Sequence, residues 1–253
     1  MKPFRKIWGI PFPLAVAIAL CVSYALIFGK PTYIVWTIKM EAAKNSRLWV
    51  VPIPLPNTSI SQGKGITENF FGYQFEVPWQ KGEQKQLDSI ALVFSQSGQE
   101  AVSFFNPGGD RGFIRMMKET PGLRVGYLNP LYGRENVQSD YEFVRAALNT
   151  TPSQLSLFLP WSKEVYAANL LRMKEAFILG PQGGLYSFEF GQLRGFQHGD
   201  PVRDKNVLVD AYDAGDRKFR LSFSSKSGPN GGMTQPDINR VLQTLRPAPA
   251  LQQ

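Results

Sequence analysis

Apolar and polar positions divide this chain into one long run without charge and, after it, many short segments in which the two kinds of residue alternate. The uncharged run extends from Ile7 to Gly29. A hydrocarbon core about 30 Å thick needs roughly 20 mostly apolar residues in a helix, and this run has that length. The sequence therefore predicts a transmembrane helix over residues 7–29, preceded by a basic tail over residues 1–6.

Alternation with a period of two residues predicts strands in two later parts of the chain. From Ile66 onwards, Phe71, Tyr73, Phe75 and Val77 fall on one side and small or polar residues on the other, which is typical of a half-buried strand. The same alternation recurs in five later segments: 90–94, 102–104, 186–190, 207–211 and 219–223.

Turn residues between these segments predict two hairpins. The first covers residues 89–106, with Ser97-Gly98-Gln99 as its turn, and the second turns at Asp213-Ala214-Gly215-Asp216. Four acids at positions 204, 210, 213 and 216 also raise the question of a calcium site. The spacing lacks the alternate-position ligands and terminal Glu of a helix-loop-helix site, so turn chemistry is the preferred interpretation.

Helix-start signals lie between the two groups of strands and at the end of the chain. Ser139 with Glu142 forms a capping box, and an apolar stripe follows it. A second capping box begins at Thr234 and opens a helix that Pro247 ends. Two further helix starts are predicted, at Thr151 and at Ser162.

Strands on both sides of a group of helices predict an α+β fold. We expect a central antiparallel β-sheet flanked by helices, in an exported domain over residues 57–247 that carries a helical insert at about residues 110–180. Residues 248–253 are expected to be a short tail.

A juxtamembrane and proline-rich linker is expected over residues 30–56. It ends in the alternating segment 51–56, VPIPLP, in which proline fixes φ and removes amide donors, so an extended spacer or an edge strand is predicted. Residues 33–38 either lie at the membrane interface, where Tyr and Trp rings are favoured, or continue the anchor helix past Pro31.

Charge is concentrated next to the apolar run. The 253 residues carry a formal net charge of +8, to which residues 1–29 and residues 30–47 each contribute +3. The chain from Leu48 onwards then carries only +2, without the clustered basic face of a nucleic-acid-binding domain. Basic residues on both flanks of an apolar helix favour anionic headgroups, so we expect a lipid bilayer as partner through residues 7–29 and no nucleic acid.

The single cysteine and the residues after it bear on processing of the run. Cys21 is the only cysteine, so no intramolecular disulfide is possible. Ser23 and Ala25 have the relation of a signal-peptide cleavage site, which would place the mature start at Leu26. The run exceeds the roughly 7 to 15 apolar residues of such signals, which favours an uncleaved anchor.

Orientation follows from the charges nearest the run. Lys2, Arg5 and Lys6 lie close to its start, whereas Lys30 alone lies close to its end. Positive residues near a transmembrane helix favour the cytoplasmic side. The expected location is therefore a single-pass membrane protein with its C-terminal domain outside the cytoplasm, in the periplasm.

Chemistry-bearing motifs are scarce. The chain has no G-x-S-x-G elbow, no H-E-x-x-H pair, no Walker loop and no dinucleotide fingerprint, and no cofactor or metal is expected. His198 is the only imidazole, and Arg194, His198 and Asp200 are the weak candidates for a catalytic site in one loop. The alternative is a surface loop with local hydrogen bonds.

Two segments carry a resemblance to a known fold: Gly72-Tyr73-Gln74-Phe75-Glu76-Val77-Pro78-Trp79, and the closing strands followed by Ile238-Asn239-Arg240-Val241-Leu242-Gln243-Thr244-Leu245-Arg246. Over residues 66–106 and 184–246 the chain resembles the PsbP-like fold. That fold is an antiparallel sheet with helices on both sides, found in extrinsic photosystem subunits, nuclear-transport proteins and bacterial envelope proteins. The resemblance implies protein binding, not catalysis, and no functional residue is carried over.

These patterns favour a membrane-anchored envelope protein whose exported domain is a binding or assembly module for a protein partner. The alternative is a membrane-tethered enzyme with an unmarked site around Arg194, His198 and Asp200. The sequence does not identify the partner or the oligomeric state.

Overall fold

The structure is a computed structural model that describes residues 6–7, 10–63, 65–70, 72–79, 81–87, 91–96, 100–105, 137, 139–158, 160, 162–179, 184–225 and 233–248. Parts of the predicted segments lie outside the described residues: the basic tail up to residue 5, residues 8–9 of the apolar run, Phe71, Ile90, the hairpin turn at 97–99, the insert before residue 137 and the tail after residue 248.

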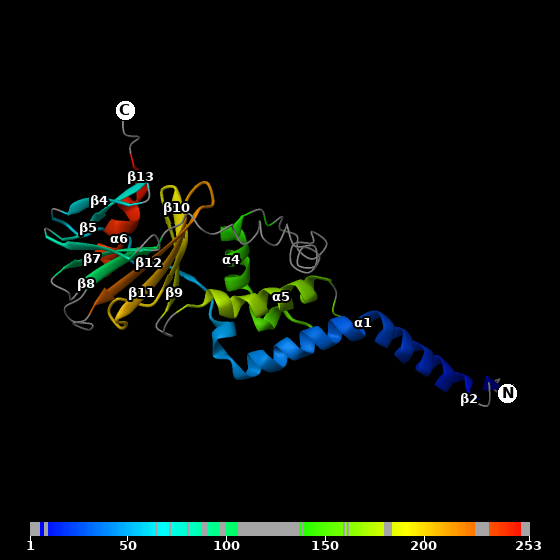
Figure 1. Cartoon of the computed structure of the whole chain (residues 1–253). Helices are drawn as coiled ribbons and strands as arrows, with labels where there is room; N and C mark the ends of the chain where they lie inside the picture. The colour runs from blue at the N-terminus through cyan, green and yellow to red at the C-terminus, as the bar shows by residue number, and fades with distance from the viewer. Residues whose placement is uncertain are drawn as a thin grey trace.

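Helix α1, Phe12–Lys44, begins later and ends much later than the predicted apolar helix. Two short strands that pair with each other precede it, β1 (Lys6–Ile7) and β2 (Ile10–Pro11). The helix contains Pro31 and bends near its middle (Figure 1). Proline removes an amide donor and crowds the carbonyl four residues earlier, which bends a helix.

The larger sheet has eight strands in the order β3-β9-β10-β11-β12-β8-β7-β6. Every neighbouring pair is antiparallel except β3 with β9, which is parallel, so the sheet is mixed and not wholly antiparallel. The strands are β3 (Ile53–Pro54), β6 (Glu83–Leu87), β7 (Ala91–Gln96), β8 (Glu100–Phe105), β9 (Leu185–Phe190), β10 (Leu193–His198), β11 (Asn206–Tyr212) and β12 (Lys218–Ser225).

A smaller sheet has three antiparallel strands in the order β13-β5-β4. Its strands are β4 (Ile66–Phe70), β5 (Tyr73–Val77) and β13 (Arg246–Pro247). The sequence predicted one strand where β4 and β5 form a hairpin, because the alternation continues through the turn. Gly72 has φ +76° there, a conformation that glycine adopts without a steric penalty.

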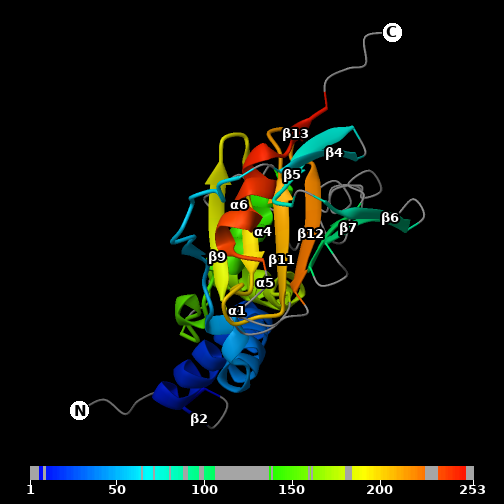
Figure 2. The same ribbon diagram turned by 90° about the vertical axis from the view of Figure 1, so that its left-hand side faces the viewer.

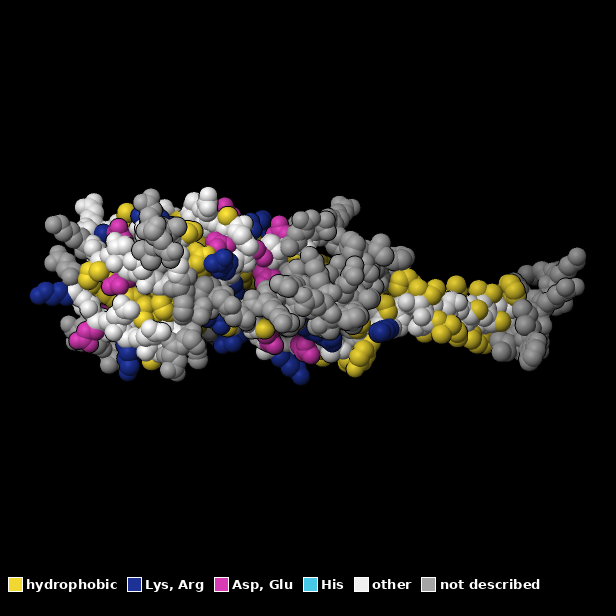
Figure 3. Space-filling view, turned by 45° about the horizontal axis from the view of Figure 1, so that its top comes forward, with side chains coloured by type: hydrophobic (Ala, Val, Ile, Leu, Met, Phe, Trp, Pro, Cys, Tyr) yellow, Lys and Arg dark blue, Asp and Glu magenta, His cyan; other side chains and the backbone are white. Residues whose placement is uncertain are grey.

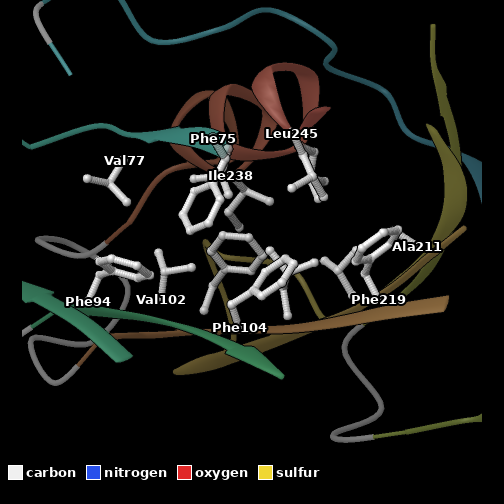
Figure 4. Packing of buried hydrophobic residues seen from close by; sticks show 14 of the residues in the cluster. Phe75, Val77, Phe94, Val102, Phe104, Ala211, Phe219, Ile238 and Leu245 are labelled. Atoms are coloured by element: carbon white, nitrogen blue, oxygen red, sulfur yellow. The ribbon is translucent and has the colours of Figure 1, made fainter. Parts of the chain in front are cut away.

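The main hydrophobic core lies between one face of the larger sheet and a layer made of the smaller sheet and helix α6 (Gln235–Thr244) (Figure 4). Phe75 of β5 stacks on Phe104 of β8 with ring centroids 5.5 Å apart. The ring centroids of Phe104 and of Phe219 on β12 lie 5.8 Å apart. Aromatic pairs at these separations add to the stabilisation from burial.

Helix α4 (Asp140–Asn149) packs on the opposite face of the larger sheet, so Figure 2 shows α6 in front of the strands and α4 behind them. Tyr141, Val144 and Leu148 of α4 contact Phe196 and Tyr212, whose side chains point away from α6. Predicted starts at residues 139, 162 and 234 are confirmed by α4, by α5 (Ser162–Phe177) and by α6. The predicted start at Thr151 yields only the 3₁₀ turn η3, Pro152–Gln154.

Residues 30–44 were predicted as part of a linker, with continuation of the helix past Pro31 as the alternative for residues 33–38; in the structure they continue α1 and join the folded part. Val35, Ile38 and Ala42 are buried in a second core with residues of α5, and Leu48 of the 3₁₀ turn η1 (Ser46–Trp49) joins them. Burial of these side chains against α5 keeps the helix intact beyond Pro31. The exposed half of α1 is thus joined to the fold by an uninterrupted helix.

Strand β10 was not predicted. Its sequence alternates in polarity only weakly, since Arg194, Gln197 and His198 lie in it. Gly191 has φ +61° in the tight turn between β9 and β10, which pairs Phe190 with Leu193. The α+β class is confirmed, and β10 completes the sheet surface under α4.

Candidate interaction groove and the residues beneath it

A groove of about 880 Å³ lies between helix α4 and the edge of the larger sheet formed by β9 and β3. A volume of this size is typical of ligand-binding clefts. Its lining residues come from β3, α4, β9 and β10 with one residue ahead of α4: Pro52, Pro54, Val137, Tyr141, Glu142, Arg145, Ala146, Asn149, Ser187, Phe188, Glu189 and Phe196.

The wall formed by α4 is fixed to the sheet by Asp216, from the turn between β11 and β12. The Asp216 carboxylate accepts hydrogen bonds from the backbone N–H of Asp140 at 2.5 Å and of Tyr141 at 3.1 Å. Ser139 accepts from the N–H of Glu142 at 3.1 Å. The first amides of a helix lack intrahelical partners and favour negative charge, so this double cap stabilises the start of α4.

Aromatic and cationic side chains form the floor at the start of α4. Tyr141 and Phe196 stack with centroids 5.5 Å apart, and the Arg194 guanidinium lies 4.2 Å from the centre of the Tyr141 ring. The pKa of Tyr141 is raised, first by burial and then by the charge of Glu189, while Arg145 and Arg194 oppose the rise. Tyr141 is therefore a neutral phenol at physiological pH.

The rim of the groove carries charges of both signs. Arg145 and Asn149 are exposed one turn apart on α4, and Glu189 is exposed on β9 opposite Arg194 in the sheet register. An extended polypeptide that contacts this rim would find a cation, an anion and an amide around apolar floor residues. Such mixed surfaces with an aromatic centre are common in protein–protein recognition.

His198 lies at the far end of β10 and is only 2% exposed. The backbone N–H of Leu179 donates to its Nδ1 at 3.4 Å, so Nδ1 carries no proton in this arrangement. Burial lowers the pKa of His198 to about 4, and the positive charges of Arg220 and Lys218 act in the same direction while Asp210 opposes them. The imidazole is a neutral, buried side chain at physiological pH.

Asp210 forms a buried charge cluster next to His198. Its carboxylate accepts two hydrogen bonds from Arg220, at 2.8 and 3.0 Å, and forms an ion pair with Lys218 at 3.0 Å. Burial raises the pKa of Asp210, but the Arg220 hydrogen bonds and the two positive charges outweigh it and hold the pKa below its usual value. The sequence holds the signal for this pair, because a hairpin turn at residues 213–216 places Asp210 opposite Arg220.

Asp200 lies in the turn after β10 and shapes that turn. It accepts from the N–H of Val202 at 2.9 Å and forms an ion pair with Arg203 at 3.8 Å. Arg194 and His198 share a face of β10, but four residues of strand separate them by about 13 Å. The three candidate catalytic residues are therefore not brought together: Arg194 contacts Tyr141, His198 is buried, and Asp200 holds a turn.

Lys174 of α5 was not singled out in the sequence, yet it is fully buried. Its Nζ donates to the carbonyl oxygens of Thr150 at 2.8 Å and of Leu48 at 3.1 Å. Burial lowers its pKa to about 8. Lys174 thus joins the end of α4, the turn after α1 and helix α5, and only the fold reveals this, because nothing in the local sequence distinguishes it from Lys163 of the same helix.

Among the residues that the structure describes, no group of three or more His, Cys, Asp or Glu side chains lies close enough to hold a metal ion. The four acids considered for calcium are spread out: Asp204 accepts from the N–H of Asp200, Asp213 from the N–H groups of Gly215 and Arg217, and the other two have the roles given above.

The chain was compared with protein-family models, with curated proteins and with solved structures, and none of them matches it.

Proposed function

We propose that this protein is a single-pass membrane protein of the bacterial envelope whose extracytoplasmic α+β domain binds or assembles with a protein partner. The observation that carries the proposal is the division of α1 into two halves: residues before Pro31 are apolar and exposed, whereas Val35, Ile38 and Ala42 after it are buried in the fold. The first half is largely exposed, and the second is part of the domain.

The exposed half has the properties of a membrane span. The described chain contains one helix long and apolar enough to cross a membrane, Phe12–Lys44, and its most apolar 18-residue window has a mean hydropathy of 2.2 with none of it buried. Residues 12–29 extend about 27 Å at the helical rise, close to the thickness of a bilayer core. Figure 3 shows apolar side chains around this half, while charged side chains gather on the rest.

Orientation and the kind of partner complete the proposal. Lys2, Arg5 and Lys6 place the N-terminus in the cytoplasm and the domain outside it. The groove between α4 and β9 is the proposed binding surface, and its rim charges fit a polypeptide with charges of both signs. A PsbP-like fold is part of the same proposal, because proteins of that fold mostly bind other proteins.

Reversal of a rim charge tests the binding surface. Full-length protein carrying Arg145→Glu is cross-linked in intact cells, purified from membranes and compared with wild type for its bound proteins. The matched control is Lys85→Glu, since Lys85 is also exposed but lies on β6 at the opposite edge of the sheet. We expect about a tenfold loss of one partner with Arg145→Glu, equivalent to about 1.4 kcal/mol, and no loss with the control.

Equal recovery of all proteins with both variants would contradict binding at the groove. A substrate turned over by the purified full-length protein would contradict the non-enzymatic assignment.

A further inference from the structure

We infer that Leu157 and Phe158, in the loop between η3 and α5, form a second membrane contact that inserts into the interfacial layer of the bilayer beside α1. The inference rests on the proposed function, because it requires the first half of α1 to span the membrane. It adds a specific docking surface and fixes which end of the domain faces the lipid.

Helices α1 and α5 lie side by side and run in the same direction. Near their C-terminal ends, Asn45 donates a hydrogen bond to Glu175. Farther back, Ile38 and Leu171 belong to the same buried cluster. Both helices rise about 1.5 Å per residue. Ser162 lies thirteen residues before Glu175, and Thr32 lies thirteen residues before Asn45. Ser162 is therefore level with Thr32, which directly follows Pro31.

The loop before α5 therefore lies at the end of the domain from which the free half of α1 emerges, as Figure 1 shows for the start of α5. Leu155, at the beginning of this loop, is buried against the second half of α1. Two and three residues after Leu155, the side chains face outward: Leu157 is 40% exposed and Phe158 is 78% exposed.

A compact turn supports this outward projection. The Ser156 hydroxyl donates to the carbonyl of Phe158 at 3.1 Å and accepts from its N–H at 3.3 Å. Satisfied backbone groups lower the cost of moving a turn into an environment with little water. Two adjacent large apolar side chains are thus exposed at a turn whose first residue, Leu155, is buried against α1.

The neighbouring residues match a lipid interface better than a protein groove. Tyr33 and Trp36 are exposed on α1 just beyond the level of the loop, and such rings favour the headgroup region. Lys30 precedes them and Lys163, 79% exposed, follows the loop, so cations accompany the apolar tip. Because the described part of the loop lies at the end of the domain from which the apolar half of α1 emerges, both would face the same bilayer.

Fluorescence quenching tests the contact in the full-length protein. In a Cys21→Ser background, Phe158→Cys, Leu20→Cys and Val202→Cys are each labelled with an environment-sensitive fluorophore and reconstituted into vesicles of phosphatidylcholine and phosphatidylglycerol in equal parts. Leu20 lies in the proposed span, and Val202 is an exposed apolar residue in the turn after β10. Lipids that carry a nitroxide at a shallow acyl position act as the quencher.

We expect the nitroxide to lower fluorescence at positions 158 and 20 by about twofold or more and to leave position 202 unchanged, because interfacial side chains lie about 5–10 Å into the headgroup and acyl boundary. Quenching at position 20 without quenching at 158 would overturn the second contact and leave the anchor intact. Absence of quenching at position 20 would overturn the proposed function. Energy transfer between labels at position 158 in two copies, abolished by dilution with unlabelled chain, would overturn the lipid assignment in favour of self-association.

Discussion

The charge of individual buried polar residues in this protein depends on the side of the sheet on which they lie. His198 and Asp210 both point away from α6, and burial forces one to be neutral and the other to be paired. The sequence identified His198 as unusual because it is the only imidazole. It did not reveal the burial, since the strand that carries His198 lacks a clear alternation and Gly195 interrupts its apolar side.

The packing around Gly195 leaves no room for an apolar side chain at this position. A Cβ atom at this position would lie 2.2 Å from the carbonyl oxygen of Asp210 and 2.8 Å from the ring of Phe188. The close approach of β11 and the ring above the strand exclude any side chain. A pattern search counts glycine as a break, although the fold requires it for strand packing.

The lowered pKa of His198 predicts a pH dependence of stability. The ordinary pKa is 6.5 and the folded value is about 4, so the unfolded chain binds a proton first as the pH falls. The free energy of unfolding should therefore decrease from pH 6.5 downwards until about pH 4, by about 3 kcal/mol in total, and no such loss should occur above pH 6.5. Urea unfolding of the full-length protein in detergent at a series of pH values measures it.

The variant His198→Gln supplies the control for that measurement, because glutamine does not titrate. Its free energy of unfolding should lack this step, so the difference between wild type and variant should shrink as the pH falls from 6.5 to 4. A constant difference across that range would contradict the assigned pKa.

At the scale of elements, α4 depends on a cap that comes from elsewhere in the chain. Ser139 was predicted from the capping box, whereas Asp216 was predicted only as a turn residue. Its φ of +62° and its bonds to two amides of α4 give it a second role that local sequence does not show.

Removal of that cap should loosen α4. Asp216→Ala leaves two helix-start amides without their acceptor and places alanine at a positive φ. We therefore expect the free energy of unfolding to fall by about 1–2 kcal/mol. Asp216→Asn tolerates the backbone and keeps one acceptor, and its loss should be smaller. Hydrogen exchange should accelerate in residues 140–149 and stay unchanged in α6. Equal exchange in α4 for wild type and Asp216→Ala would contradict the role of this cap.

Lys174 is the corresponding link between the turn after α1 and the rest of the domain. Lys174→Met removes both hydrogen bonds and leaves the carbonyls of Leu48 and Thr150 without that donor. The free energy of unfolding should fall by about 1–3 kcal/mol. Arg172→Met is the matched control, because Arg172 is exposed on the same helix, and it should change stability by less than about 0.5 kcal/mol. The urea concentration at half-unfolding, measured in detergent, compares the two variants with wild type.

The lowered pKa of Lys174 adds a pH signature to this comparison. Because the folded value is about 8 and the ordinary value 10.5, wild type should gain stability as the pH rises from 8 towards 10.5, relative to Lys174→Met. Parallel pH profiles for the two proteins would show that the amine titrates normally in the folded state.

For the whole molecule, sequence patterns predicted the α+β class and most elements, because periodicity and capping residues are local. They did not predict that residues 30–44 join the domain, since burial of Val35 and Ile38 depends on α5, more than a hundred residues away. Nor did they predict the groove, which depends on the packing of α4 over β9. The candidate catalytic residues were close in sequence, but the strand geometry separates them.

The domain should be reachable from outside the cell membrane. In the Cys21→Ser background, a thiol introduced by Val202→Cys should react with a membrane-impermeant maleimide in cells whose inner membrane is intact, because Val202 is exposed and far from α1 along the chain. Labelling only after the inner membrane is broken would place the domain in the cytoplasm and reverse the orientation.

The intact mass of the protein that remains in membranes after an alkaline carbonate wash distinguishes a membrane span from a cleaved signal. Carbonate removes proteins held by peripheral contacts and leaves those with a membrane span. We predict a membrane-retained chain that still contains residues 7–29. A chain that begins at Leu26 and is recovered in the wash would contradict it, because the apolar half of α1 would then be a cleaved signal and not an anchor.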